Sequence, residues 1–186
     1  MPKLPKIHQL TEVSDGLFTI EKLDLEFSNG VRRQFQRVKT IGLGAVIVVP
    51  MLDENTVLLV REYAAGIHAY ELGLPKGRIE KGESMLEGAN RELQEEAGYA
   101  ARQLQELTSL TLAPGYMTHR TFIVLARDLY PHRIPGDEPE ELEVVPWDIN
   151  RLEQLVGRDD CTEGRTIAAL YIARDYLQNN PSGKSS

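Results

Sequence analysis

The first half of the chain alternates apolar and polar residues in short runs that predict β-strands joined by turns. Residues 17–27 and 31–38 are rich in β-forming residues, and Ser28-Asn29-Gly30 between them predicts an antiparallel hairpin. Residues 46–49 form a continuous β-branched run, which is typical of a strand buried on both faces. A further strand, residues 56–60, follows after a polar turn. We expect these strands to build a central sheet.

A change of period from two residues to about 3.6 predicts a helix between residues 84 and 98. Ser84 and Glu87 match a capping box, in which each side chain bonds a main-chain N–H of the first turn. Gly98 suits the left-handed residue that ends many helices. One face of this helix is apolar and consists of Leu86, Ala89, Leu93 and Ala97.

Downstream patterns predict three more strands, residues 104–112, 121–129 and 142–147, and a closing helix, residues 166–177. Many strands with one early and one late helix indicate an α+β protein or an α/β/α sandwich. We expect the main domain over residues 41–180, preceded by an N-terminal antiparallel strand pair within residues 1–40. The polar end, residues 181–186, is expected to be a flexible tail.

The composition is that of a globular protein, with 186 residues of which 41% are hydrophobic and 26% charged. A chain of this length can bury one substantial core. The longest apolar run, residues 43–52, contains Pro50 and is shorter than the roughly 20 residues of a membrane helix. Residues 1–10 lack the apolar stretch of a secretory signal. We therefore expect no membrane span and a cytoplasmic location.

The charge and the cysteine content disfavour further classes of protein. Cys161 is the single cysteine, which leaves no disulfide and no cysteine zinc site within the chain. The 28 acidic and 21 basic residues give a formal net charge of −7, which disfavours a nucleic-acid partner. Scattered acids would only favour solubility, whereas concentrated acids could collect cations. The positions of the carboxylates decide between these interpretations.

Three glutamates share one flank of the predicted helix. With Leu93 at the centre of the apolar face, Glu96, Glu92 and Glu95 lie about 60°, 100° and 160° to one side. Like charges four residues apart repel each other, and a cation would relieve this repulsion. Carboxylate oxygens suit Mg²⁺ or Mn²⁺. The alternative is a solvated charged face that pairs with Arg91.

The loop before this helix contains three glycines and one proline within residues 73–83. Loop and helix together are similar to the Nudix box, the loop–helix–loop motif of the Nudix hydrolases. All seven invariant positions of that motif match, namely Gly77, Glu83, Arg91, Glu92, Glu95, Glu96 and Gly98. A chance match at average composition has a probability of roughly 10⁻⁹ per starting point. Tyr99 stands where the motif usually has an aliphatic residue. This difference affects packing after the helix and not metal binding.

This resemblance implies an α/β/α sandwich around a mixed sheet and the cleavage of a nucleoside diphosphate linked to another group. It also implies that Arg91 holds loop and helix together through an ion pair with Glu83. Metal ions would neutralise the charge that develops on the pyrophosphate oxygens. The implied ligands of Mg²⁺, or of Mn²⁺ in its place, are Glu92, Glu96 and the main-chain carbonyl of Lys76, with Glu95 as a further ligand or a water-orienting catalytic carboxylate.

Residues outside the box indicate a branch of the family. Pro114, which follows the box, resembles the marker of the ADP-ribose pyrophosphatase branch. Stretches 23–33, 61–64, 70–73, 128–131 and 136–140 resemble bacterial ADP compounds hydrolases, which act on ADP-ribose, short diadenosine polyphosphates and NADH. Ala64 and His119 depart from many ADP-ribose pyrophosphatases. The resemblance therefore favours a hydrolase of several ADP-containing compounds over one that is specific for ADP-ribose.

The segment of residues 136–143 is strongly acidic, and the corresponding loop of this branch supplies a catalytic carboxylate. Glu138 or Glu140 is the candidate general base, and the alternative is a solvated acidic turn. The segment and the invariant positions of the box together hold nine of the 28 acids, and without these nine the formal net charge would be +2 instead of −7. The acid excess is thus concentrated where a polyanionic substrate would be repelled unless divalent cations intervene.

Four residues are candidates for substrate contact: Arg61 and Arg78 for phosphate, and Tyr63 and Phe27 for an adenosine ring. Solvated arginines and core aromatics are the alternatives. The resemblance further implies that the N-terminal strands embrace a second subunit, so we expect a homodimer. Two other functions stay open, a nucleotide-sensing module without activity and a hydrolase of RNA 5′ ends. The intact glutamate set opposes the first, and the lack of a basic and aromatic patch opposes the second.

Overall fold

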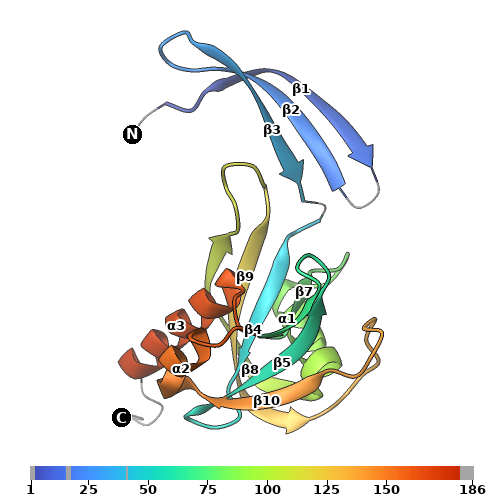
Figure 1. The fold of residues 1–186 in the computed structure, drawn as a ribbon, viewed down its shortest axis with the longest axis vertical. Helices are drawn as coiled ribbons and strands as arrows, with labels where there is room; N and C mark the ends of the chain where they lie inside the picture. The colour runs from blue at the N-terminus through green and yellow to red at the C-terminus, as the bar shows by residue number, and fades with distance from the viewer. Residues whose placement is uncertain (1–2, 16–17, 41, 181–186) are drawn as a thin grey trace.

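The computed structural model describes residues 3–15, 18–40 and 42–180, so the predicted tail of residues 181–186 lies outside it. Figure 1 shows an N-terminal sheet that stands apart from a larger α/β body. The sheet meets the body at the loop between β8 (Tyr99–Thr111) and β9 (Arg120–Pro131), where Val38 forms a parallel bridge with Met117. The main-chain N–H of Thr40 also donates to the Thr118 hydroxyl at 2.8 Å.

The N-terminal sheet has three antiparallel strands in the order β1 (Lys6–Asp15), β2 (Phe18–Glu26) and β3 (Arg32–Lys39). The predicted hairpin of the second and third strands is confirmed, and Gly30 takes the left-handed conformation in its turn with φ of 79°. The first strand was not predicted. A register shift between Ile7 and Gln9 interrupts its alternation, so its apolar residues do not recur with period two.

The body contains two sheets instead of the single sheet that we expected. One has four strands in the order β7 (Lys76–Arg78), β4 (Ala45–Pro50), β9 (Arg120–Pro131) and β8 (Tyr99–Thr111), with β4 parallel to β9. The other is antiparallel, in the order β10 (Glu143–Asp148), β5 (Thr56–Ala64) and β6 (Ala69–Gly73). The mixed pairing of the larger sheet agrees with the expected mixed architecture.

Helices cover both faces of these sheets (Figure 1), which confirms the α/β/α sandwich. The first helix, α1 (Met85–Glu92), continues into a π-helical turn over Leu93–Ala97. The second face carries α2 (Leu152–Val156), preceded by a 3₁₀ turn over Ile149–Arg151, and α3 (Gly164–Asn179). Within the described ranges, no helix is long and apolar enough to cross a membrane.

Two cores lie on opposite faces of β4, because successive side chains of a strand point to opposite sides. Val46 and Val48 pack with residues of α1, whereas Ile47 and Val49 pack with residues of α2 and α3. Every residue of β4 is buried, as the β-branched run predicts. The strand therefore fixes α1, with its glutamates, against the centre of the body.

Candidate active site

A capping box fixes the start of α1. The Ser84 hydroxyl accepts the main-chain N–H of Glu87 at 3.3 Å, and the Glu87 carboxylate accepts the main-chain N–H of Ser84 at 2.7 Å. Both predicted bonds are therefore present. They satisfy two N–H groups that the first turn of a helix leaves unpaired. The preceding loop consequently enters the helix in a defined direction.

Arg91 ties this loop to the helix. Its guanidinium donates to both carboxylate oxygens of Glu83, at 3.1 and 2.9 Å, and to the main-chain carbonyl of Arg78 at 2.9 Å. The bond from Arg91 holds the pKa of Glu83 below its ordinary value. The expected ion pair of Arg91 and Glu83 is thus found. The same guanidinium also donates to Glu92 at 2.8 Å and to Glu95 at 2.9 Å.

Glu92 and Glu96 are buried glutamates of α1 and its π-helical turn, with only 8% and 4% of their surface exposed. The Glu92 carboxylate lies against the backbone of Gly77, where any Cβ would overlap it. The Glu96 carboxylate accepts the main-chain N–H of Lys76 at 3.2 Å. The Nudix-box loop therefore covers both carboxylates with main chain and leaves no room for a side chain at Gly77.

Burial changes the acidity of these two groups. It raises the pKa of Glu92 to about 7, against the opposing charge of Arg91, and the neighbouring Glu95 and Asp137 add to the increase. Burial also raises the pKa of Glu96 to about 9, with Glu62 and Glu92 adding to the increase and Lys76 opposing it. Several carboxylates thus lie close together with little solvent around them. A divalent cation would stabilise their ionised forms.

Glu62 is a member of the site that the sequence analysis did not identify. It lies on β5 and forms an ion pair with the Lys76 ammonium. The signal that could have found it is the period of the strand. Val60 is buried in the core on the α1 face, so the side chain two residues later points to the same side. Lys76 therefore contributes its ammonium as well as its main chain to the site.

The acidic loop, defined here as residues 136–143, lies beside this cluster. A Cβ at Gly136 would lie 3.2 Å from the Glu95 side chain, so the loop packs closely on the helix. The Glu138 side chain is exposed, but neighbouring groups remove part of its solvation and so raise its pKa, and the charges of Glu62 and Asp137 raise it further. Glu140 is engaged elsewhere, because the Tyr70 hydroxyl donates to it at 2.5 Å. Of the two candidate bases, Glu138 is thus the one without a side-chain hydrogen bond elsewhere among the described residues, and its pKa responds to the charge of Glu62.

The four candidate substrate residues lie at different places. Tyr63 is 42% exposed on β5, and its ring contacts that of Tyr70, which reaches the acidic loop. The Arg78 side chain is exposed beside the box. Arg61 instead forms ion pairs with Glu143 at 2.8 Å and Asp160 at 2.7 Å. Phe27 packs on Phe35 in the N-terminal sheet, with ring centroids 6.2 Å apart. The structure therefore links Tyr63 to the acidic loop through Tyr70, and the main chain of Arg78 to Arg91.

The carboxylates fit a hard divalent cation by their chemistry. Carboxylate oxygens of α1 and its π-helical turn lie beneath a glycine-rich loop, and the acidic loop packs on Glu95 beside them. Nitrogen donors of Arg91 and Lys76 neutralise part of this charge in the structure. Among residues 3–15, 18–40 and 42–180, no three His, Cys, Asp or Glu side chains have the geometry to hold a metal.

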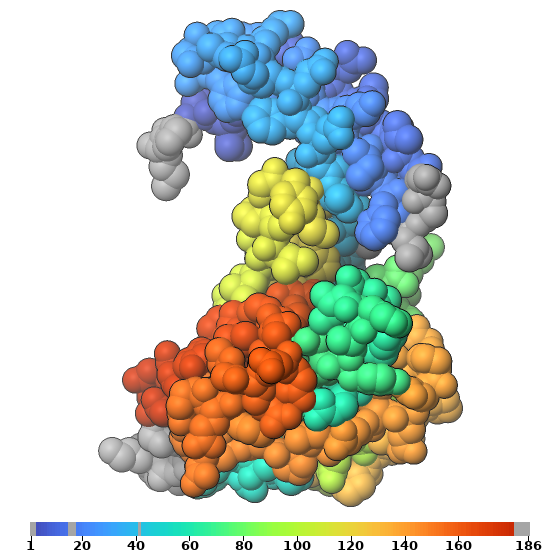
Figure 2. Space-filling model, in the orientation of Figure 1, coloured from blue at the N-terminus to red at the C-terminus, as the bar shows by residue number. Residues whose placement is uncertain are grey.

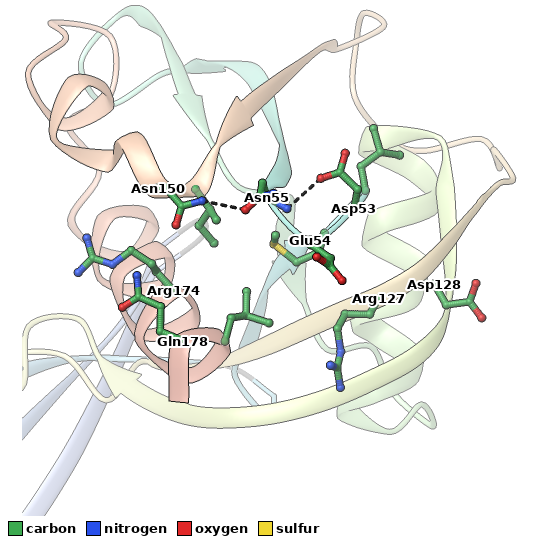
Figure 3. A pocket seen from close by; sticks show the side chains of 12 residues that line it. Asp53, Glu54, Asn55, Arg127, Asp128, Asn150, Arg174 and Gln178 are labelled. Atoms are coloured by element: carbon green, nitrogen blue, oxygen red, sulfur yellow. Dashed lines mark hydrogen bonds between the residues drawn. The ribbon is translucent and has the colours of Figure 1, made fainter. Parts of the chain in front are cut away.

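A cleft of about 400 Å³ lies at another edge of the body and is lined by no residue of the Nudix box (Figure 3). The Asn150 side chain donates there to the Asn55 side chain at 3.0 Å. Charged lining residues are engaged with neighbours, for example Arg174 with Asp175 at 2.9 Å. The converging carboxylates, and not this cleft, therefore form the candidate active site.

Family models match both the body and the N-terminal sheet. The NUDIX domain model matches residues 43–164, and the model of the NudE-type Nudix hydrolase N-terminal domain matches residues 5–37. The chain is 46% identical to the ADP compounds hydrolase NudE of Escherichia coli (strain K12), with 90% of each chain covered. It is 30% identical to the ADP-ribose pyrophosphatase of Bacillus subtilis (strain 168), with 83% and 82% covered.

A crystal structure of an ADP compounds hydrolase superposes with a TM-score of 0.90 at 43% identity, covering 97% of this chain and 98% of that one. The matched NUDIX domain contains the capped helix, the buried glutamates and the glycine loop described above. Family model, overall fold and local site agree, and the chain therefore belongs to the Nudix hydrolases.

Proposed function

We propose that the protein is a Mg²⁺-dependent pyrophosphohydrolase of ADP-containing compounds. Its substrates would be ADP-ribose, short diadenosine polyphosphates and NADH, and its products AMP or another nucleotide. The observation that carries this proposal is the pair of buried carboxylates, Glu92 and Glu96, beneath the main chain of Gly77. The similarity to relatives named for ADP compounds and ADP-ribose supports the substrate class.

Glu92, Glu96, Glu95 and the main-chain carbonyl of Lys76 would hold Mg²⁺, with Mn²⁺ as a substitute. The bound metal supplies charge neutralisation for the diphosphate oxygens and orients a water. Arg91 keeps Glu92 and Glu95 in place through its two hydrogen bonds of 2.8 and 2.9 Å. Because Arg91 is itself bound to Glu83, the ligands are oriented by a supporting shell of residues.

Glu138 would act as the general base that takes a proton from the attacking water. It lies in the acidic loop, where loss of solvation and the charges of Glu62 and Asp137 raise its pKa. A carboxylate with a raised pKa is a stronger base. Arg78, exposed beside the box, would contact phosphate, and Tyr63 would contact the adenosine end. Phe27 would reach that end from a second subunit, because it lies at the β2–β3 turn of the N-terminal sheet.

We also propose that the protein forms a homodimer through this sheet and works in the cytoplasm. The dimer is supported by the large apolar side chains that β1 and β3 expose, among them Leu10 and Phe35 with 41% and 43% of their surface accessible. Such side chains on a thin sheet favour an interface. The cytoplasmic location is a prediction from the sequence alone.

The test is incubation of the full chain with ADP-ribose, diadenosine triphosphate, NADH and a nucleoside triphosphate, with and without Mg²⁺. We expect hydrolysis of the first three only with the metal. Glu96→Gln should lower the rate at least about 100-fold. Glu106→Gln, which changes an exposed glutamate of β8, is the matched control.

Two results would contradict the proposal at different levels. If Glu96→Gln hydrolysed every substrate as fast as the parent, the assignment of Glu96 as a metal ligand would be wrong. If only the nucleoside triphosphate were hydrolysed, the ADP-compound assignment would fail, whereas the Nudix assignment would stand.

A further inference from the structure

We propose that Tyr70 is a positioning residue that fastens the acidic loop through Glu140 and so directs Glu138 at the carboxylate cluster. This inference rests on the proposed function, because it concerns the candidate base of that reaction. It assigns separate tasks to two glutamates that the sequence does not distinguish. Glu138 would act on the water, whereas Glu140 would hold the loop.

The acidic loop depends on side chains for its position. Between residues 133 and 142, the described structure contains no hydrogen bond between main-chain groups. Leu142 is buried and anchors the end of the loop, and Gly136 packs on Glu95 near its start. The ion pair of Glu141 and Arg133 is long, at 3.5 Å, and Glu141 is 78% exposed, so it contributes little. The middle of the loop needs another attachment.

Tyr70 provides that attachment. Its hydroxyl donates to the Glu140 carboxylate at 2.5 Å, which joins β6 to the acidic loop. The bond lies at the solvent-exposed surface, and its charged acceptor makes it shorter and stronger than a bond between neutral groups at the same place. The β5–β6 hairpin and the acidic loop also adjoin on the face of the molecule seen in Figure 2. Because Glu140 raises the pKa of Tyr70, the hydroxyl keeps its proton and stays a donor.

The ring of Tyr70 is itself supported. It meets the edge of the Tyr63 ring at 5.7 Å between centroids with an interplanar angle of 64°. The Tyr63 hydroxyl is hydrogen-bonded to His68 at 2.6 Å within the same hairpin. Three side chains of one hairpin therefore form a connected group on its surface. Because these contacts fix the position of the Tyr70 hydroxyl, this hydroxyl can restrain the acidic loop.

Pro139 transmits the restraint from Glu140 to Glu138. The proline ring fixes its own φ near −65°, and it confines the preceding residue to extended conformations. The segment from Glu138 to Glu140 is therefore stiff. When Tyr70 fixes Glu140, the direction of Glu138 is fixed as well. In the proposed function, this direction is toward the carboxylate cluster.

The experiment compares Tyr70→Phe, Glu140→Ala and Glu140→Gln in the full chain, with ADP-ribose and saturating Mg²⁺. Tyr70→Phe and Glu140→Ala should each lower kcat roughly 10-fold, with KM and Mn²⁺ affinity unchanged, because the base is misdirected while the binding groups are intact. Glu140→Gln keeps an oxygen that can accept from Tyr70, so its kcat should stay within about 2-fold of the parent. Combining Tyr70→Phe with Glu140→Ala should lower kcat no further than either change alone.

Hydrogen–deuterium exchange supplies a readout that is independent of activity. Tyr70→Phe should accelerate exchange of the amides of residues 136–142, and Tyr130→Phe, a matched change on β9, should not. The inference is overturned if Tyr70→Phe keeps both the parent kcat and the parent protection. It is also overturned if Glu140→Gln is as inactive as Glu138→Gln, because Glu140 would then be the base.

If the proposed function is wrong, a different experimental result is expected. If Glu138→Gln retained the parent kcat, Glu138 would not be the base, and the directing role of Tyr70 would be wrong with it. The fastening of the loop by Tyr70 would still be decided by the exchange rates, which do not depend on which residue performs the chemistry.

Discussion

Gly77 lets the Glu92 carboxylate approach the loop backbone because it has no side chain. The Glu92 carboxylate lies directly against its backbone, and any Cβ would occupy the position of the carboxylate. Gly136 has a related role on the other side, because a Cβ there would lie 3.2 Å from the Glu95 side chain. Two acids of the cluster are therefore covered by glycine backbone. The loops can approach the helix closely only at residues without a side chain.

We expect Gly77→Ala to weaken metal binding by roughly 10- to 100-fold, because the new methyl group must displace Glu92 and so disturb the ligand set. The measurement is a titration of the full chain with Mn²⁺, followed by electron paramagnetic resonance. Gly66→Ala is the matched control, since a Cβ at Gly66 would meet no atom within 4 Å. Equal Mn²⁺ affinities for the parent and Gly77→Ala would contradict this account of Gly77.

At the scale of elements, the sequence is most informative where the pattern is local. The β-branched run predicts β4, and the capping box with its apolar face predicts α1, because both signals lie within the element itself. The 3.6-residue period cannot reveal the π-helical turn over Leu93–Ala97, in which the N–H of Gly98 donates to the carbonyl of Leu93. β6, β7 and α2 are short, and pairing or packing with distant segments defines them.

The same limit applies to the site. Glu92 and Glu96 could be predicted because they lie on one flank of one helix, close to each other in sequence. The period of β5 could have placed Glu62 on the α1 side of the strand, but its ion pair with Lys76 depends on how β5 packs against the Nudix-box loop. The bond from Tyr70 to Glu140 joins segments that are 70 residues apart, so only the fold reveals it. Composition and periodicity contain no information about such pairs.

The capping box makes a testable contribution to α1. Ser84→Ala removes the acceptor for the N–H of Glu87, and we expect it to lower the free energy of unfolding by about 1 kcal/mol. Urea unfolding followed by circular dichroism gives this value. Ser28→Ala is the matched control, because no side-chain partner of Ser28 is found among the described residues. If both variants unfolded at the same urea concentration, the cap would not stabilise the helix.

At the scale of the whole molecule, Asp160 joins segments that are far apart in sequence. Its carboxylate accepts from Arg61 of β5 at 2.7 Å and from Arg158 at 2.7 and 2.8 Å. Its main-chain carbonyl accepts the N–H of Leu72 of β6 at 2.5 Å. The bonds from Arg158 and Arg61 hold the pKa of Asp160 well below its ordinary value. The folded protein therefore favours the ionised carboxylate.

This shift predicts how the effect of Asp160→Asn depends on pH. Because the pKa is lowered on folding, the charge of Asp160 stabilises the protein in full above about pH 4, where the unfolded side chain is ionised. The contribution disappears as the pH falls from there toward the folded pKa. The stability difference between parent and variant should thus be constant from pH 8 to 5 and decrease below pH 4.

Urea unfolding at a series of pH values measures this difference. Asp159→Asn, a change to an exposed neighbour, should have a smaller effect at pH 7, because Asp159 has no ion pair in the described part of the chain. If the stability difference between the parent and Asp160→Asn increased below pH 4, its pH dependence would have the wrong sign. The lowered pKa of Asp160 would then not be the cause of the stabilisation.

The N-terminal sheet cannot bury an apolar core by itself. Leu10, Leu23 and Phe35 lie opposite one another across β1, β2 and β3, and they therefore share one face of the sheet. Leu23 is buried, whereas Leu10 and Phe35 are 41% and 43% exposed. A three-stranded sheet needs a partner for such a face. In the proposed homodimer, the second subunit would provide it.

We expect Leu10→Asp combined with Phe35→Asp to convert the dimer to a monomer, because two buried charges without partners cost several kcal/mol at an interface. Sedimentation velocity of the full chain at micromolar concentration measures the mass. Gln36→Asp is the control, since Gln36 is exposed on the opposite face of β3, across from Lys22. This variant should sediment with the mass of the parent. If the double variant kept a dimeric mass, or if the parent were monomeric, the face that contains Leu10 and Phe35 would not be the subunit interface, and Phe27 could not reach the substrate of a second subunit through it.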